Sequence, residues 1–179
     1  GLGQVVLTLR ELSLGHAGAF AVKADAFAVT IALAAPLTGD SPITSVRVTR
    51  PEVDLAAYGS AALLGSRAAR ARVLAALGAD RIEIEGGRIV VPGAHGQPLV
   101  ISDVTGGAVR EADALRVALQ GRTAEGTVDV TGDAGLDGES LVFTVGGRDL
   151  QAAAVPPFGE GMRGTMDLRL DIHARGDAA

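Results

Sequence analysis

Hydrophobic and polar residues alternate with a period of two over most of this chain. Residues 115–120 read Leu-Arg-Val-Ala-Leu-Gln, and residues 162–173 repeat the same alternation. Because successive side chains of a strand point to opposite sides, this pattern predicts strands with one apolar and one polar face. The predicted strands cover residues 5–14, 27–33, 43–55, 99–101, 115–120, 127–131, 141–145 and 162–173.

Residues 81–91 predict a tight β-hairpin. Two alternating runs flank Gly86-Gly87, and a glycine pair tolerates the positive φ that a two-residue turn requires. The predicted register pairs Glu85 with Arg88, Ile84 with Ile89, and Ile82 with Val91. The four aliphatic residues would then form one patch, on the face opposite the charged pair.

Three other segments interrupt the alternation. The phase of the first strand shifts at Glu11, which is consistent with a bulge. Pro51 predicts either an edge strand or a break, since proline cannot donate to a ladder. Residues 60–77 are rich in helix formers, with Ser60 as a possible N-cap and Gly78 as a C-terminal cap, and they predict one short helix.

The whole chain is expected to form one mainly β domain over residues 1–179. Its parts would be first strands at 1–55, a helical insertion at 56–80 and a meander of hairpins at 81–176. A twisted sheet with one apolar side folds on itself, closes as a barrel, meets a second sheet or leaves a groove. We expect a long antiparallel meander curved into a U-shaped groove, with a β-sandwich as the alternative.

Composition narrows the functional classes. Hydrophobic residues make up 47% of the chain but aromatic residues only 3%, so the apolar face is almost wholly aliphatic. The formal net charge of −5 argues against nucleic acid as the main partner. With no cysteine, the chain has neither disulfides nor a thiolate metal site.

The sequence contains no recognisable catalytic motif. His16, His95 and His173 have no metal-ligand spacing to one another. Residues 133–139 faintly resemble a calcium loop, but the twelfth position is Thr144 instead of glutamate, so a hairpin turn is the stronger interpretation. We therefore expect no enzyme, no cofactor and no metal.

Three passages resemble the AsmA-like family of periplasmic proteins in Gram-negative bacteria, which is related to the bridge-like lipid-transfer proteins. The first runs from Pro36 to Leu55, with a "PL.G" turn and an "RPEVDL" ending. The second is residues 81–91 followed by the run at 99–104, and the third is the strand at 162–176. The resemblance implies a taco-like β-groove that shelters phospholipid or another acyl lipid and contributes to lipid transport or outer-membrane homeostasis.

The resemblance also implies a periplasmic location, with an inner-membrane anchor in a larger parent protein. The present chain enters a strand pattern at once, without an initiator methionine, and is expected to be a fragment of that parent. Arg67, Arg70 and Arg72 would contact lipid headgroups, although a solvated helix face explains these arginines as well. The expected groove lining is Val29, Ile31, Ile82, Ile84, Ile89, Val117, Leu119, Val128, Val130, Phe143, Met166, Leu168 and Leu170. The alternative is a closed β-sandwich, a structural or interaction module without ligand.

Overall fold

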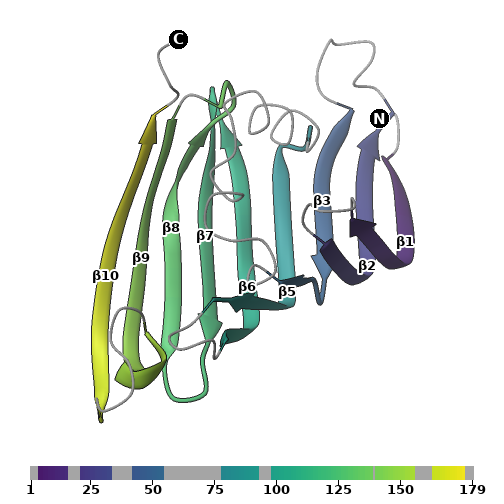
Figure 1. Ribbon diagram of the computed structural model, residues 1–179. Coiled ribbons are helices and arrows are strands. Elements are labelled where there is room, and N and C mark those ends of the chain that lie inside the picture. Colours follow the sequence, from purple (N-terminus) through teal and green to yellow (C-terminus); the bar gives the residue numbers. More distant parts are fainter. Residues whose placement is uncertain are drawn as a thin grey trace.

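The computed structural model describes residues 4–15, 21–33, 42–54, 78–92, 98–138, 140–155 and 163–175. Its strands lie side by side in one large curved sheet (Figure 1). They are β1 (Gln4–Gly15), β2 (Ala21–Ala32), β3 (Ile43–Thr49), β4 (Glu52–Asp54), β5 (Arg81–Val91), β6 (Leu99–Glu111), β7 (Ala114–Arg122), β8 (Thr127–Gly135), β9 (Ser140–Gln151) and β10 (Thr165–Arg175). A short 3-10 helix, η2 (Ala152–Ala154), follows β9. The predicted helix at 60–77 and the predicted headgroup residues Arg67, Arg70 and Arg72 lie outside the described residues.

The strand order confirms the expected mainly antiparallel meander and includes one parallel junction. The path runs β1-β2-β3-β5-β6-β7-β8-β9-β10, with β4 beside β2 and β5. Neighbours along this path are antiparallel, except that β3 and β5 are parallel. β4, which lies off the path, is antiparallel to β2 and parallel to β5. All described strands belong to this single sheet, so they do not form the two facing sheets of the sandwich alternative.

The predicted hairpin at 81–91 is wrong, because these residues form one continuous strand. Ile84 and Ile89, expected to pair with each other, instead pair with Gly106 and Ile101 of β6. Gly86 does adopt a positive φ of 67°, but it accommodates a bulge and not a chain reversal. Pairing with β6 on one side and with β3 and β4 on the other extends through both halves of the strand, which outweighs a local turn.

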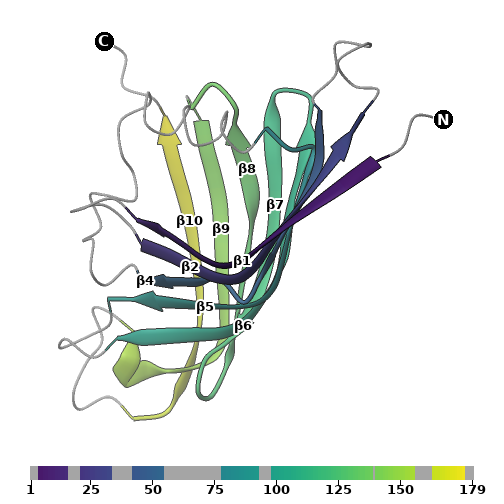
Figure 2. The same ribbon diagram turned by 90° about the vertical axis from the view of Figure 1, so that its right-hand side faces the viewer.

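A sharp bend crosses β1 to β6 at positions where the backbone leaves the normal strand region. Glu11, Arg50 and Asp103 have φ values of 53°, 48° and 51°, in β1, at the β3–β4 break and in β6. Figure 2 shows the result: β4 and the labelled parts of β5 and β6 run across the view, whereas β7, β8 and most of β9 and β10 stay upright. Pro51 thus marks a break within the sheet and not an edge strand. We call Arg50–Pro51, Gly86–Gly87 and Asp103–Val104 the corner.

Backbone hydrogen bonds fix the strands at the corner. The Arg50 N–H donates to the Glu85 carbonyl at 2.7 Å, and the Arg88 N–H donates to the Pro51 carbonyl, also at 2.7 Å. The Arg50 guanidinium, on the solvent side, donates through Nε to Asp25 Oδ2 at 2.6 Å. The break in one strand and the bulge in the next are therefore bonded to each other, so the sheet stays continuous through the bend.

Candidate functional site

The register of the sheet aligns the apolar residues of all the strands on its main path into continuous rows. Each member of a row is the cross-strand partner of the next, and paired residues share a face. The first apolar row consists of Leu7, Val29, Val46, Ile82, Ala108, Val117, Gly132, Phe143 and Ile172. The second apolar row consists of Leu9, Phe27, Val48, Ile84, Gly106, Leu119, Val130, Val145 and Leu170. Neither row contains a polar side chain.

The row between them has the opposite character and lies on the other face. It contains Thr8, Ala28, Arg47, Glu83, Gly107, Ala118, Thr131, Thr144 and Asp171. Here Arg47 Nη2 lies 2.8 Å from Glu83 Oε2, and the Thr144 hydroxyl donates to Asp171 Oδ1 at 2.7 Å. One face of the sheet is therefore aliphatic and the other carries hydrogen bonds and ion pairs.

Two groups on the polar face have shifted pKa values. The hydrogen bond to Glu83, with the nearby charges of Glu85 and Glu83, raises the pKa of Arg47 above its usual value. The hydrogen bond from Thr144, followed by the influence of Arg169 and His173, lowers the pKa of Asp171. Both charged forms are stabilised by neighbours on the polar face.

The apolar face is the inner side of the bend. A hollow of about 200 Å³ is lined by residues from before the corner, such as Val48 and Ile84, and from beyond it, such as Val53 and Ile89. Residues on both sides of a bend meet in one hollow only on its concave side. Val48 and Val53 are an odd number of positions apart and would lie on opposite faces of a regular strand. The break at the corner shifts the alternation by one residue, so both lie on the apolar face.

The corner is the tightly packed part of this face. Pro51, Gly87 and Val104 are buried there, and Val104 is only 3% exposed. A Cβ placed on Gly87 would lie 3.1 Å from Pro51 Cγ and 3.3 Å from Val104 Cβ. Any larger residue at position 87 would push Pro51 or Val104 aside by a few tenths of an ångström, so close packing on the inner side of the bend favours glycine there.

Away from the corner the apolar face remains partly open. Among the described residues, no large side chain is fully buried. At the two edges of the sheet, Leu7 and Leu9 are each 53% exposed and Leu170 is 48% exposed. Two small clusters form the nearest equivalent of a core, one around Leu115 and the other around Val128, Leu150 and Val155. The rows thus run from one exposed edge to the other through a half-buried centre.

The structure brings the predicted lining residues onto this one face. Nine of them lie in or beside the two rows: Val29, Ile31, Ile82, Ile84, Val117, Leu119, Val130, Phe143 and Leu170. Ile89 lines the hollow beyond the corner. Met166 and Leu168 pack against the cluster that contains Val128. That these residues bind lipid stays a prediction.

The prediction missed the inner residues of the corner and several members of the rows. Val46, Val48 and Phe27 belong to alternating runs that the sequence shows, but without a register nothing joined them to the predicted lining. No alternation pattern identifies Pro51, Gly87 and Val104 as part of the site. Because the sequence interpretation makes Gly86-Gly87 a turn, it does not predict the bend. Only the pairing of β5 with β6 identifies them as part of the site.

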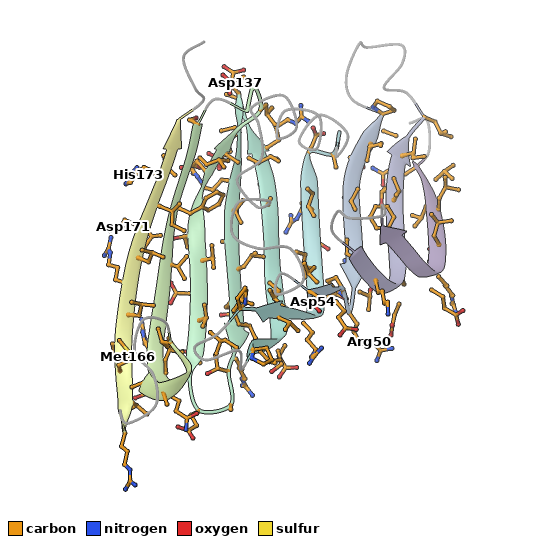
Figure 3. The ribbon with its side chains drawn as sticks, viewed as in Figure 1. Arg50, Asp54, Asp137, Met166, Asp171 and His173 are labelled. Carbon is orange, nitrogen blue, oxygen red and sulfur yellow. The ribbon has the colours of Figure 1, made fainter. Side chains whose placement is uncertain are left out.

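The described residues show no arrangement typical of a metal centre or a membrane span. They contain no group of three or more histidine, aspartate or glutamate side chains that would hold a metal ion. Residues 133–139 comprise the end of β8 and its connection to β9, and the described part of this connection, residues 136–138, forms a turn, which confirms the hairpin interpretation. His173 lies on β10 and is exposed (Figure 3), while His16 and His95 fall outside the described residues. The same part of the chain contains no helix with the length and hydropathy of a transmembrane segment.

Comparison with known proteins leaves the resemblance to the AsmA-like family as an expectation. No family model matches the chain. No curated protein matches it, and neither does a solved structure.

Proposed function

We propose that this chain shelters or conducts the acyl chains of phospholipid along the apolar face of its sheet. The single observation that carries the proposal is the pair of apolar rows, which cross every strand of the main path without a polar side chain. Their exposed ends, Leu7 and Leu9 on β1 and Leu170 on β10, make the track accessible from both edges of the sheet.

The proposed mechanism is passive and needs no catalytic group. Each acyl methylene that leaves water for an apolar surface gains about 0.8 kcal/mol, so a short length of chain lying along one row is already stabilised. Aliphatic side chains offer no hydrogen bond and no fixed orientation to an acyl chain, which favours movement along the rows. A charged headgroup would stay at the rim, where it keeps its water.

The setting of this activity is proposed from the family resemblance. It would be the periplasm of a Gram-negative cell, with a parent protein anchored in the inner membrane and a part in lipid transport or outer-membrane homeostasis. Contact of Arg67, Arg70 and Arg72 with headgroups belongs to the same proposal.

Native mass spectrometry of the purified 179-residue chain, combined with lipid extraction, tests the proposal. We expect phospholipid to co-purify at a reproducible ratio and detergent to release it. Titration of the delipidated chain with an apolar dye should give saturable uptake. A clean protein mass, together with no uptake of dye or added phospholipid, would contradict the proposal and favour a structural sheet without ligand.

A further inference from the structure

Among the described strands, β10 forms one edge of the sheet. Within the described residues it pairs only with β9, and the strand path ends there. Natural edge strands are usually protected by short length, proline, bulges, charged side chains or charges that point toward the apolar side. The charges of β10, including Arg169 and Asp171, lie on its polar side and are of both signs. β10 has eleven residues and no proline or glycine, and its apolar side carries only Met166, Leu168, Leu170 and Ile172. One register irregularity, between Met166 and Leu168, lies near its beginning.

The sequence of β10 is complementary to itself about Leu170, which is its central residue. Two copies paired antiparallel about this position place Leu170 opposite the partner's Leu170. Two positions further along, Leu168 lies opposite the partner's Ile172. Because opposite residues share a face, the apolar side of one copy meets the apolar side of the other.

The polar side of β10 is complementary in the same register. Arg169 lies opposite the partner's Asp171, and Asp171 opposite the partner's Arg169, so opposite charges meet twice. Both side chains are available: Arg169 is 75% exposed and Asp171 is 48% exposed. Thr144 already holds Asp171 Oδ1, and Oδ2 faces Arg169 Nε of the same chain at 3.4 Å. Figure 3 shows Asp171 and His173 along the open side of the strand.

We propose that β10 is a dimerisation edge, at which two copies of this chain pair antiparallel about Leu170. The two-fold axis then stands perpendicular to the sheet, so the apolar faces of both copies lie on the same side. The second apolar row, which ends at Leu170, continues directly into the second apolar row of the partner. The dimer forms one longer sheet whether or not lipid binds.

The other open edge, β1, lacks this complementarity. Pairing β1 with itself about Leu7 would place Arg10 opposite the partner's Gln4, with no opposite charges in contact. Beyond Arg10 the strand carries the left-handed Glu11, which interrupts a regular ladder. A third arrangement, β10 against the partner's β1, joins different edges and would give open-ended chains instead of dimers.

A charge exchange within β10 tests the proposal by analytical ultracentrifugation of the 179-residue chain. The wild type should be dimeric. Arg169→Asp places two aspartates opposite each other at both ends of the register, and Asp171→Arg does the same with two arginines. Each single change should weaken dimerisation about tenfold or more. The double variant Arg169→Asp/Asp171→Arg restores both opposite-charge contacts and should return the dimer to within about threefold of the wild type.

Two control variants separate this edge from other surfaces. Arg122→Asp makes the same change of charge on β7, an interior strand, and should leave the dimer intact. Arg10→Asp makes it on the opposite edge and should also have no effect. Circular dichroism confirms that each variant keeps its β structure. A monomeric wild type, assemblies larger than a dimer, loss of the dimer with Arg10→Asp, or a double variant as weak as the single ones would each overturn the proposal.

Discussion

The two faces of this sheet differ completely over a distance of one residue. On β7, Val117 belongs to the first apolar row and is half-buried, while the next residue, Ala118, lies on the polar face and is exposed. On β3, Arg47 stands between Val46 and Val48 and pairs with Glu83 of β5. The same backbone therefore supports a continuous aliphatic surface on one side and scattered ion pairs on the other.

The two faces contribute differently to the stability of the sheet. The polar face is held together by exposed pairs, which contribute little individually because water and salt screen them. Burial of apolar side chains stabilises the fold on the apolar face, yet most of the large side chains there stay partly exposed. An ordinary core would cover such a surface, so the open part of the apolar face is where we place the function.

Aspartate substitutions at two neighbouring residues should give the largest difference in stability between the two faces. Val117→Asp places a carboxylate in the first apolar row, and we expect a loss of about 3 kcal/mol of unfolding free energy and of dye uptake. Ala118→Asp adds the same charge on the polar face and should change stability by about 0.5 kcal/mol or less. Urea titration measures both. Equal effects of the two variants would show that the faces do not differ as described.

Removal of methyl groups should reduce the unfolding free energy more at the corner than on the exposed surface. Val104→Ala deletes two methyl groups where the side chain is 3% exposed, and should cost about 2 kcal/mol of unfolding free energy. Val109→Ala makes the identical change on the same strand, where the side chain is 45% exposed, and should cost less than about 0.5 kcal/mol. If both variants unfold at the same urea concentration, the corner is not a packed element.

Replacement of a charged residue on the polar face should have a small effect. Arg47→Gln removes the ion pair with Glu83 but keeps a long side chain, and should shift the urea midpoint less than any of the apolar-face substitutions, because water and salt screen this exposed pair. The difference from wild type should vanish in about 1 M salt, where the Debye length falls to about 3 Å. A loss of stability as large as that of Val104→Ala would indicate that the polar face contributes as much as the corner.

The smallest predicted effect is a change in the pKa of one side chain, Asp171. The Thr144 hydroxyl lowers the pKa of Asp171, so the stabilisation is present at neutral pH and is lost as the pH falls through the lowered pKa. Thr144→Val should raise the pKa of Asp171 toward its ordinary value. An NMR titration of the Asp171 carboxyl carbon measures this change. An unchanged pKa would show that Arg169 and His173 account for the shift instead.

The sequence predicted the faces of the sheet well, because alternation is a local property. Runs such as Leu115 to Gln120 specify which residues share a side wherever the strand is placed. The sequence did not reveal the bend, because Gly86-Gly87 suits a turn and a bulge equally. That choice depends on β6, whose Gly106 and Ile101 pair with Ile84 and Ile89, and on the parallel strands β3 and β4.

Pairing between strands distant in sequence therefore determines that residues 81–91 form a bulged strand and not a hairpin, which the local pattern leaves open. The parallel junction between β3 and β5 has the same origin, since no alternation pattern records the direction of a neighbouring strand. Joining Val46 and Val48 to the rest of the site likewise required the register across the sheet.

If acyl chains lie on the apolar face as proposed, a pair of tryptophan variants will detect them there. The chain contains no tryptophan, so a single one reports without background. Phe143→Trp places it in the first apolar row, and Val142→Trp places it one residue away on the polar face, where Val142 is 44% exposed. Each variant is titrated with phospholipid carrying bromine atoms on its acyl chains, which quench tryptophan fluorescence on contact. We predict strong, saturable quenching at position 143 and little at position 142. Equal quenching at both positions, or none at position 143, would show that acyl chains do not lie on the apolar face.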